Sequence, residues 1–431
     1  MIKQDDKHIQ SVRGMHAHLP KDAVILQNIE NVLKTILNSY GYNEIKLPVI
    51  EFSKLFKRSI GEITDVVEKE MYIFRDRHGN DLALRPEGTS GCARAGIEHS
   101  LFYHQEQRLW YMGSMFRQER PQKGRYREFY QFSAEAFGQI GPDIDLELIL
   151  IVSRCWKELG ISEYISLELN SIGLLSSRMI YREKLIDFLE KNKQNLDHDS
   201  LCRLYSNPMR ILDTKNEKIK KLLINAPVLR DFLDDASRLH FTELCELLDS
   251  CGIKYTVNPY LVRGLDYYNR TVFEWITDSL GAKKTICAGG RYDDLVRQLG
   301  GRSVPAIGFS IGLERVSLLM KVMYNEKIFI FSKKMNIDVY LSSSGTDAKK
   351  YSIFLSEYIH KKIPILRLML NHGDSNLKQQ FDQAVKNNAQ IILIIKKQNV
   401  FEKTVILKNL KSGQQEILQY NDIITRLCSI L

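Results

Sequence analysis

Two segments of this chain, RLWYMGSMF and REFYQFSAEAFG, are rich in aromatic residues and have the composition of β-strands. A short connection dense in arginine joins them. The charged side chains from Met115 to Phe129 are Arg117, Glu119, Arg120, Lys123, Arg125, Arg127 and Glu128. Guanidinium groups bind phosphate oxygens through paired hydrogen bonds. The pattern therefore favours a phosphate-binding site carried on strands, and an exposed hairpin of scattered charge is the alternative.

Arg117 and Glu119 are the candidate ligand-binding residues in this connection. Arg117 stands at the end of an apolar strand, where it can be held rigidly, and Glu119 could accept a hydrogen bond from a base amino group. The usual nucleotide-binding loops are missing from the sequence, because it has no GxxxxGK[ST] and AGGRYDD does not match GxGxxG. A phosphate site would have to be built from arginine side chains on a β scaffold.

Two further segments place polar residues at the ends of predicted strands. LRPEGT puts the carboxylate of Glu87 and the hydroxyl of Thr89 in a turn. That pair could hold an ammonium group, although such turns are common. GLER puts Arg315 where a strand runs into a helix. The N-terminus of that helix adds its own affinity for anions.

The segment LVRGLDYYNRTVFE combines an arginine with two adjacent tyrosines. Arg263 precedes Gly264, and Tyr267 and Tyr268 follow. We expect a strand here, so that only one of the two tyrosines faces a given side. The alternative is an ordinary strand with one core tyrosine, one surface tyrosine and a surface arginine.

The first 330 residues have the pattern of a β-rich body, and the length of 431 residues suggests roughly two or three domains. Apolar spacing predicts a helix over 20–40, ended by Gly41, and strands over 72–84 and 109–137. NEIKLPVIE is predicted as one strand, with Pro48 at an edge or end. A further helix is predicted in GPDIDLELILIVSRCWKELG.

A helical piece interrupts this body between about residues 174 and 252. Pro208 and Pro227 break its segments. The strand ISLELNSIG precedes it, and strands resume at YLVRGLDYYNRTVFEWIT. VPAIGFSIGLERVSLLM then predicts a strand that runs into a helix. This order indicates a helical domain inserted into the β-rich body.

Beyond a short linker near residues 331–336, the pattern becomes that of a separate α/β domain of about 95–100 residues. Its predicted strands are IDVYLSS, PILRLML and QIILII, and its predicted helices are DAKKYSIFLSEYIHKK and SNLKQQFDQAVKNN. A hairpin through Ser412 and Gly413 and a last helix complete it.

The net charge of +9 is unevenly distributed. From Phe331 to the end there are 15 Lys and Arg against 8 Asp and Glu, or +7, whereas the remainder has 46 against 44, or +2. A basic tail domain on a nearly neutral body favours a polyanionic partner. A solvated lysine-rich surface is the alternative.

Composition argues against membrane and secreted classes. No apolar run is long enough to span a bilayer, and the N-terminus MIKQDDKHIQ is too polar for a secretory signal. The 7 cysteines are scattered, odd in number and without a CxxC pair. We expect reduced thiols in a cytoplasmic protein, and neither a disulfide framework nor a zinc site.

Together these segments resemble the class II aminoacyl-tRNA synthetases, and within that class the histidyl-tRNA synthetase family. GYNEIKLPVIE, MFRQERPQKGRYREF and IGFSIGLER resemble the three class motifs in order, the first being the dimer motif. LVRGLDYYNRTVFE and AGGRYD are particular to the histidyl family, and LRPEGT, RGMHAHLP and GEITDVVEKEMY agree with it. The resemblance runs from about Ser11 to the C-terminus.

The resemblance implies a definite fold. It implies an α+β catalytic domain over 1–330, built on an antiparallel β-sheet flanked by helices and interrupted by an inserted helical domain at about 174–252. It also implies a C-terminal α/β anticodon-binding domain with a mixed sheet over 331–431. NHGDSNLKQQF and IIKKQNV depart from the family's usual pattern, so the anticodon contacts are not assigned.

The activity implied is that of a histidine–tRNA ligase. Such an enzyme activates L-histidine with ATP, assisted by Mg²⁺, to histidyl-adenylate and pyrophosphate, and then transfers histidine to the 3′ end of tRNA(His). The family also implies a homodimer. One alternative is a synthetase-like regulatory subunit of histidine biosynthesis, which would lack the basic tail domain and some catalytic residues. Another is a non-enzymatic RNA-binding protein.

The family's residue roles fall on matching positions of this sequence. The histidine-binding positions implied are Glu87, Gly88, Thr89, Gln131, Glu135, Tyr267, Tyr268 and Tyr292. The ATP-binding positions implied are Arg117, Glu119, Phe129 and Arg315. The catalytic positions implied are Arg263 and Arg117, with Arg263 standing where other class II enzymes tend to use a metal ion. Gln122 would approach the first base pair of the tRNA acceptor stem.

Overall fold

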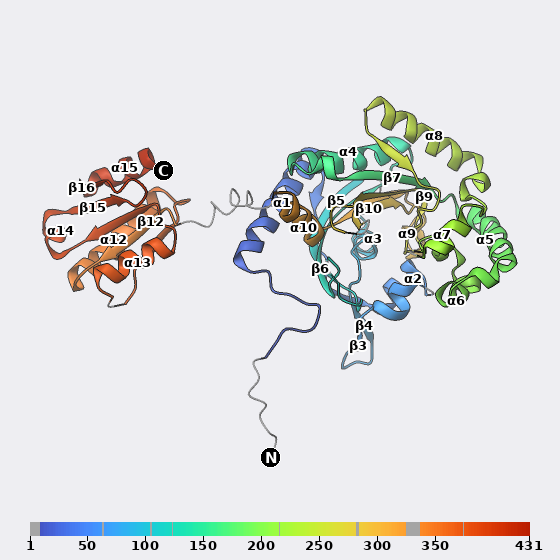
Figure 1. Ribbon diagram of the computed structural model, residues 1–431, viewed down its shortest axis with the longest axis horizontal. Coiled ribbons are helices and arrows are strands. Elements are labelled where there is room, and N and C mark those ends of the chain that lie inside the picture. Colours follow the sequence, from blue (N-terminus) through green and yellow to red (C-terminus); the bar gives the residue numbers. More distant parts are fainter. Residues whose placement is uncertain are drawn as a thin grey trace, which may run out of the picture. The chain divides into compact units, whose positions relative to one another are not determined.

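The computed structural model describes residues 9–324, except 63, 104–105, 123, 215 and 282–283, and residues 337–431, except 374. The chain forms two compact units, Met1–Ile328 and Phe329–Leu431, both drawn in Figure 1. The linker predicted near 331–336 lies outside the described residues.

An eight-stranded sheet forms the centre of the first unit, in the order β1-β5-β6-β11-β10-β9-β7-β8 (Figure 1). Its inner strands are antiparallel, and the outermost strands β1 and β8 pair in parallel with β5 and β7. The strands are β1 Asn43–Glu44, β5 Gln107–Phe116, β6 Glu128–Phe137, β7 Ser166–Ser171, β8 Tyr255–Val257, β9 Asn269–Thr277, β10 Lys284–Arg291 and β11 Ala306–Gly312. The predicted α+β architecture on an antiparallel sheet is confirmed.

Helix α1 (Pro20–Ser39) packs against α4 (Pro142–Glu158) and α10 (Leu313–Tyr324), and the three cover one face of this sheet. In α1 and α4 the proline lies in the first turn, where the missing N–H breaks no helical hydrogen bond. Trp110 of β5 donates from Nε1 to Asn38 Oδ1 of α1 at 3.1 Å. Because side chains alternate along a strand, the neighbouring Tyr111 points to the opposite face.

On the other side of the unit, helices α2 (Ser53–Ile60), α3 (Thr89–Glu98) and α9 (Leu295–Gln298) contact one another. A small sheet, with the order β2-β4-β3, contacts α2. Its strands are β2 Ile50–Phe52, β3 Ile73–Arg75 and β4 Asp81–Leu84.

The single strand predicted over NEIKLPVIE is wrong. Asn43–Glu44 joins the large sheet, whereas Ile50–Phe52 joins the small one. Pro48, between them, has no N–H to offer to a ladder. The carbonyl oxygens of Leu47 and Pro48 instead accept hydrogen bonds from the buried Arg85 Nη1, at 3.0 and 3.3 Å.

The helical piece predicted at about 174–252 is observed between β7 and β8. It contains α5 Leu175–Lys191, α6 His198–Ser206, α7 Glu217–Leu223 and α8 Asp235–Ser250 (Figure 1, green to yellow). Pro208 starts a short 3₁₀ turn. The chain returns as β8, which pairs in parallel with β7, so both ends of the piece meet at one edge of the large sheet.

The strand predicted from Tyr260 begins later than expected, at Asn269. The preceding residues are irregular because their backbone groups bond elsewhere: Leu261 N–H donates to Asn258 O in a turn, and Asp266 N–H donates to Ile60 O. Arg263, Tyr267 and Tyr268 therefore lie in a loop, and strand alternation does not apply to them.

The second unit has a five-stranded mixed sheet in the order β13-β12-β14-β15-β16. Its strands are β12 Val339–Ser343, β13 Leu368–Leu370, β14 Ile391–Ile395, β15 Thr404–Asn409 and β16 Gln415–Gln419. Its helices are α12 Thr346–Lys362, α13 Leu377–Lys386, α14 Lys397–Glu402 and α15 Ile423–Ile430. The predicted α/β pattern is confirmed, and α14 is an addition to it.

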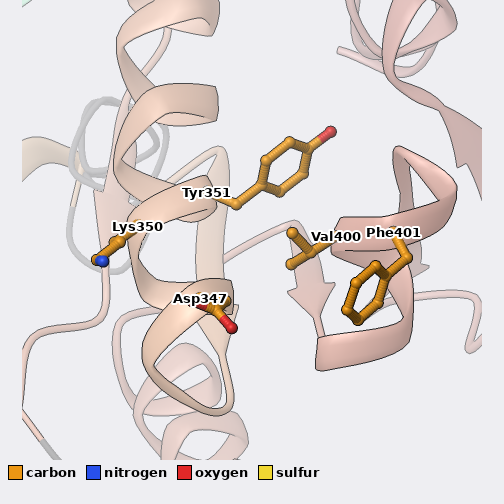
Figure 2. Close-up of a pocket in the computed structure, with 5 residues that line it drawn as sticks. All are labelled: Asp347, Lys350, Tyr351, Val400 and Phe401. Carbon is orange, nitrogen blue, oxygen red and sulfur yellow. The ribbon is translucent and has the colours of Figure 1, made fainter.

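A cavity of 420 Å³ lies between α12 and α14 in this unit. Figure 2 shows the residues that line it, Asp347, Lys350, Tyr351, Val400 and Phe401. Tyr351 comes from α12 and Phe401 from α14, and the Phe401 side chain is 76% exposed. This cavity belongs to the C-terminal unit and holds none of the predicted site residues of the first unit.

Candidate active site

Alternation along β6 brings Phe129, Gln131, Ser133 and Glu135 to the same face of the large sheet. This is the face toward which Tyr111 points, opposite the helices α1, α4 and α10. Several polar groups thus stand in one row on a rigid strand, which is a favourable base for a precise binding site.

Glycines in the neighbouring strands keep the space above this row open. Gly308 and Gly312 of β11 pair with Glu135 and Gln131, and Gly290 of β10 pairs with Gly308. A Cβ atom at Gly308 would overlap the Glu135 carboxylate. Glycine inside a strand often marks such a close approach.

Glu135 is the most buried acid of the site, with 1% of its surface exposed. Its Oε1 accepts hydrogen bonds from Thr89 Oγ1 at 2.8 Å and from Tyr111 OH at 2.7 Å, and its Oε2 accepts one from Tyr292 OH. Burial raises the pKa of Glu135 to about 8, although the three hydroxyl donors act in the opposite direction. The protonated form therefore predominates at neutral pH, and the carboxyl group can donate a hydrogen bond to a basic ligand.

Glu87 lies beside Glu135 and holds the start of α3. Its carboxylate accepts hydrogen bonds from the N–H groups of Thr89 at 2.6 Å and Ser90 at 3.1 Å. The helix N-terminus favours negative charge there. Gly88 has no side chain because a Cβ atom would overlap the Tyr111 ring. Thr89 thus bonds both acids, and the Glu87 carboxylate is the member of the pair that is suited to a cation.

Three tyrosine rings close this pocket. The ring centroids of Tyr267 and Tyr268 are 4.7 Å apart, and Tyr292 lies edge-on to them at 5.6 and 6.3 Å. All three residues are buried. The prediction that Tyr267 and Tyr268 face opposite sides is wrong, because the irregular backbone before β9 lets both rings pack in one cluster.

Arg117 lies at the end of β5, next to the acid pair. Its Nε donates to Pro86 O at 2.9 Å, and its guanidinium lies 5.4 Å from the centroid of the Phe129 ring. Stacking and this hydrogen bond fix the plane of the guanidinium and leave its terminal nitrogens for a ligand.

Arg315 adds a second guanidinium, from the first turn of α10. Its Nε donates to Gly124 O at 2.9 Å. Burial, and then the nearby positive charges of Arg125 and Arg117, lower the pKa of Arg315. Arg315 therefore lies close enough to Arg125 and Arg117 to be repelled by both, which is the arrangement expected of a site for a polyanion.

Arg263 approaches from the loop before β9. Its guanidinium lies 5.5 Å from the centroid of the Tyr268 ring and forms an ion pair with Glu274. Within the described part of the chain, Arg263 Nε and Gln131 Oε1 are both buried without a hydrogen-bond partner. A buried donor and acceptor left open in this way are suited to a ligand.

The tip of the connection between β5 and β6 is linked to the site, because Arg315 Nε donates to Gly124 O within it. Gln122 and Arg125 close a tight turn by exchanging two backbone hydrogen bonds, of 3.1 and 2.8 Å, and Gln122 is exposed. Glu119, at the base, pairs with Arg125 at 3.4 Å. Lys123 lies outside the described residues.

Three residues of the site were not expected from the sequence: Tyr111, Arg85 and Glu274. Arg85 Nε donates to Ser114 O at 2.9 Å and so supports the strand beside Arg117. Strand pairing brings Tyr111 and Glu274 to the site. The register of that pairing cannot be read from a sequence pattern. The only available signal was their place in strands that flank the predicted site residues.

Among the described residues, no group of three or more His, Cys, Asp or Glu side chains is placed to hold a metal ion. Nor does any helix in that part of the chain have the length and apolar character needed to cross a membrane.

Comparison with known proteins relates this site to one family. The model of the family described as histidyl-tRNA synthetase matches residues 14–316. The histidine–tRNA ligase of Blochmanniella floridana is 69% identical over 423 residues, which are 98% of this chain and 97% of that protein. The histidine–tRNA ligase of Blochmanniella pennsylvanica (strain BPEN) is 66% identical over 431 residues, 100% of this chain and 98% of that protein.

A solved structure shows the same relationship. The crystal structure of apo S. aureus histidyl-tRNA synthetase matches with a TM-score of 0.79 and 31% sequence identity, covering 97% of this chain and 100% of that one.

Proposed function

The chain belongs to the histidyl-tRNA synthetase family, and we propose from this premise how its residues divide the work of the reaction. The activity is that of a histidine–tRNA ligase, which activates L-histidine with ATP and transfers it to tRNA(His). The regulatory alternative is not favoured, because the relatives named histidine–tRNA ligase match 98% and 100% of this chain, including its C-terminal unit.

The observation that supports this division is that two parts of the site meet. These are the acid pocket, around Glu87 and Glu135, and the arginine cluster, which contains Arg117 and Arg315. Arg117 is held by the carbonyl of Pro86, and the next residue, Glu87, begins the acid pair. An amino acid whose ammonium group is bound by the acids would place its carboxylate toward the guanidiniums. A nucleotide phosphate bound by those guanidiniums would then lie next to the reacting carboxylate.

We assign the acid pocket to L-histidine. The α-ammonium group would be bound by Glu87, Thr89 and Gln131, over the close turn at Gly88. The imidazole ring would lie between Glu135 and Tyr268, with Tyr267 and Tyr292 behind. Glu135 holds its proton more tightly than an imidazole, whose own pKa is about 6.5, so it would donate a hydrogen bond to the unprotonated ring nitrogen.

We assign the arginine cluster to ATP in its complex with Mg²⁺. Phe129 would stack on the adenine, and Glu119 would accept a hydrogen bond from its amino group. Arg117 would bind the α-phosphate and Arg315 the γ-phosphate. The Mg²⁺ ion would arrive with the β- and γ-phosphates of the substrate.

Adenylation on this site is a displacement at the α-phosphorus. A carboxylate oxygen of histidine forms a bond to that phosphorus, and the bond to the bridging oxygen of pyrophosphate breaks. The carboxylate is already ionised at pH 7, so the step needs no general base. Arg263 and Arg117 would neutralise the charge that grows on the phosphorane and hold the two anions in line.

The transfer step requires contact with tRNA, and two features support it. Gln122 is exposed at the tip of the connection between β5 and β6, where it would reach the first base pair of the acceptor stem.

The C-terminal unit carries most of the net positive charge. Its cavity offers the rings of Tyr351 and Phe401 (Figure 2), and single-stranded RNA bases stack on such rings. We propose this unit, 331–431, as the anticodon-binding domain, and 1–330 as the catalytic domain.

A homodimer is part of this proposal, and the small sheet β2-β4-β3 supports it. Several apolar residues of this sheet, and Val49 just before it, are at least two-fifths exposed: Val49, Ile50, Phe52, Ile73 and Phe74. An exposed apolar patch of this kind is typical of a protein interface. Sedimentation velocity of the full chain would measure the expected dimer.

The cytoplasm is the compartment that we propose for this enzyme. The seven cysteines are scattered along the sequence without a CxxC pair, a pattern typical of compartments where thiols are kept reduced.

Arg263→Ala tests the catalytic assignment. Loss of one preorganised donor in such a site costs about 10²–10³ in rate. We expect a loss of this size in the rate of histidine-dependent adenylate formation, measured before the steady state, with a smaller change in the KM for histidine. Transfer from preformed adenylate should be less affected. Arg263→Lys should rescue poorly, because an ammonium group cannot span two anions with a planar fork.

Thermal melting of each variant provides the control for folding. Adenylation near the wild-type rate in a folded Arg263→Ala protein would exclude Arg263 from the reaction. An absence of histidine-dependent ATP–pyrophosphate exchange in the wild-type chain would remove the proposed function itself.

A further inference from the structure

Glu274 has no role in the assignments above, although its side chain lies on the face of the sheet that carries the site. Glu274 of β9 pairs with Ala288, Ala288 pairs with Ser310, and Ser310 pairs with Ser133 of β6. Directly paired residues point to the same face of a sheet. Glu274 is therefore on the same face as Ser133 and Glu135.

Glu274 and Thr285 connect two guanidiniums of the site. Arg263 Nη1 donates to Glu274 Oε1, and Thr285 Oγ1 donates to Glu274 Oε2 at 2.7 Å. The main-chain oxygen of Thr285 accepts a hydrogen bond from Arg315 Nη1. The side chains of Arg263 and Glu274 are 18% and 15% exposed, so solvent screens this ion pair only in part.

A β-bulge in β10 makes this connection possible. Thr285 pairs with Ile276, but Cys287 pairs with Trp275, so Ile286 is an extra residue in the ladder. Thr285 and Ala288 are three positions apart and would point to opposite faces of a regular strand. The extra residue brings both to the face of the site, which is the effect that bulges near active sites commonly have on a side chain.

We propose that Glu274 and Thr285 form a positioning bridge, which holds Arg263 and Arg315 in place before ATP binds. The proposal rests on the proposed function, in which these two guanidiniums bind the α-phosphate region and the γ-phosphate. Two cations that converge on one ligand repel each other and would otherwise turn away. The carboxylate of Glu274 offsets this repulsion, and Thr285 sets the distance between the two sites. Neither residue touches the reacting atoms.

The first test compares Glu274→Gln with the wild-type enzyme in pre-steady-state adenylation. The amide keeps the size of the side chain and removes its charge, so Arg263 loses its ion-pair partner. We expect the rate of adenylation to fall roughly tenfold or more, as for residues in one ionic network, while the KM for histidine changes little. A wild-type rate in Glu274→Gln would overturn the bridge.

Thr285 provides an independent test with a matched control. Thr285→Val removes the hydroxyl and keeps the shape, and we expect a loss of roughly 2- to 10-fold, the value of one hydrogen bond. Thr285→Ser should restore the rate. Thr271→Val makes the same change on β9 at a buried hydroxyl that has no hydrogen-bond partner in the described part of the chain, and it should leave the rate unchanged. Equal losses in Thr285→Ser and Thr285→Val would argue for packing instead of positioning.

A double-mutant cycle separates this proposal from the proposed function. If Glu274 acts through Arg263, Glu274→Gln should cause no further loss in an Arg263→Ala background. Additive losses would overturn the bridge and leave the role of Arg263 intact. A fully active Arg263→Ala would overturn both the bridge and the catalytic assignment on which it rests.

Discussion

Glu135 is an acid that the fold keeps neutral until a ligand brings positive charge. It is surrounded by the hydroxyl groups of Thr89, Tyr111 and Tyr292, and by no described cation within its hydrogen-bond contacts. Such a group favours binding of a base and opposes folding at higher pH. Function and stability therefore make opposite demands on this one side chain.

Glu135→Gln should show this conflict in the pH dependence of stability. Burial raises the pKa of Glu135 to about 8, against about 4.3 in an unfolded chain. Between these values the folded state holds a proton that the unfolded state has lost, so wild-type stability falls as the pH rises from about 4.5 to 8. We expect the ligand-free variant to melt at a higher temperature than wild type at pH 8, and this difference to shrink toward pH 5.

A glutamate outside the pocket serves as the control for this experiment. Glu106→Gln replaces an exposed carboxylate and should show a difference from wild type that varies little with pH. If the difference between Glu135→Gln and wild type is the same at pH 5 and pH 8, Glu135 is not the buried neutral acid described here. The variant should also lose most histidine-dependent exchange activity, because its amide is a weaker hydrogen-bond donor to the imidazole than a carboxyl group.

Some of the site could be predicted residue by residue, and some could not. Glu87 and Thr89 stand in one turn, and Gln131 and Glu135 stand on one strand, so local spacing places them together. Glu274 reaches the site only through three strand pairings, and Thr285 reaches it only through the bulge. That information is a property of the folded sheet and not of any short segment.

At the scale of elements, the connection between β5 and β6 works as two parts. Its base is closed where Arg117 N–H donates to Arg127 O at 2.9 Å, and Arg315 Nε donates to Gly124 O within the turn at the tip. Its tip, at Gln122, is exposed. A loop divided in this way can serve a small substrate at its base and a large one at its tip.

Gln122→Ala should separate these two parts. Among the described residues Gln122 is exposed and makes only the backbone hydrogen bonds of its turn, so adenylate formation should stay within about twofold of wild type. Aminoacylation of tRNA should fall roughly tenfold, the value expected for a lost hydrogen bond to the acceptor stem. Gln298→Ala, at an exposed glutamine on α9, should change neither rate. Equal losses of adenylation and aminoacylation would place Gln122 in the ATP site.

The elements predicted correctly are those with strong local signals. Helices α1 and α4 begin at prolines and have apolar residues at helical spacing, and β5 and β6 are long and aromatic. The errors occur where tertiary contacts override the pattern. Arg85 donates hydrogen bonds to the carbonyl oxygens of Leu47 and Pro48, and Asp266 N–H donates to Ile60 O. The segments around Pro48 and before Asn269 therefore do not form the strands that their composition favours.

At the scale of the whole molecule, chemistry and charge are assigned to different units. All proposed contacts to histidine and ATP come from Met1–Ile328, whereas most of the net positive charge follows Phe331. Since lysine and arginine bind RNA phosphates by releasing counterions, binding through such a unit weakens as salt rises.

Truncation after Ile328 should therefore divide the two half-reactions. We expect the fragment to form histidyl-adenylate but to charge tRNA poorly, and its remaining tRNA binding to depend less steeply on salt than that of the full chain. Filter binding over a series of salt concentrations, with circular dichroism as the folding control, would measure this. A folded fragment that charges tRNA as well as the full chain would contradict the role given to the C-terminal unit.

The parallel pairing of β7 with β8 also constrains how the chain reaches its native state. These two short strands are separated in sequence by the whole helical insertion, so their pairing must close a long loop, at an entropic cost that grows with loop length. Early folding of α5 to α8 would bring the two ends together and remove most of that cost. We therefore expect pulse-labelling hydrogen exchange to show protection in these helices before β8, which makes the insertion a folding nucleus for that edge of the sheet.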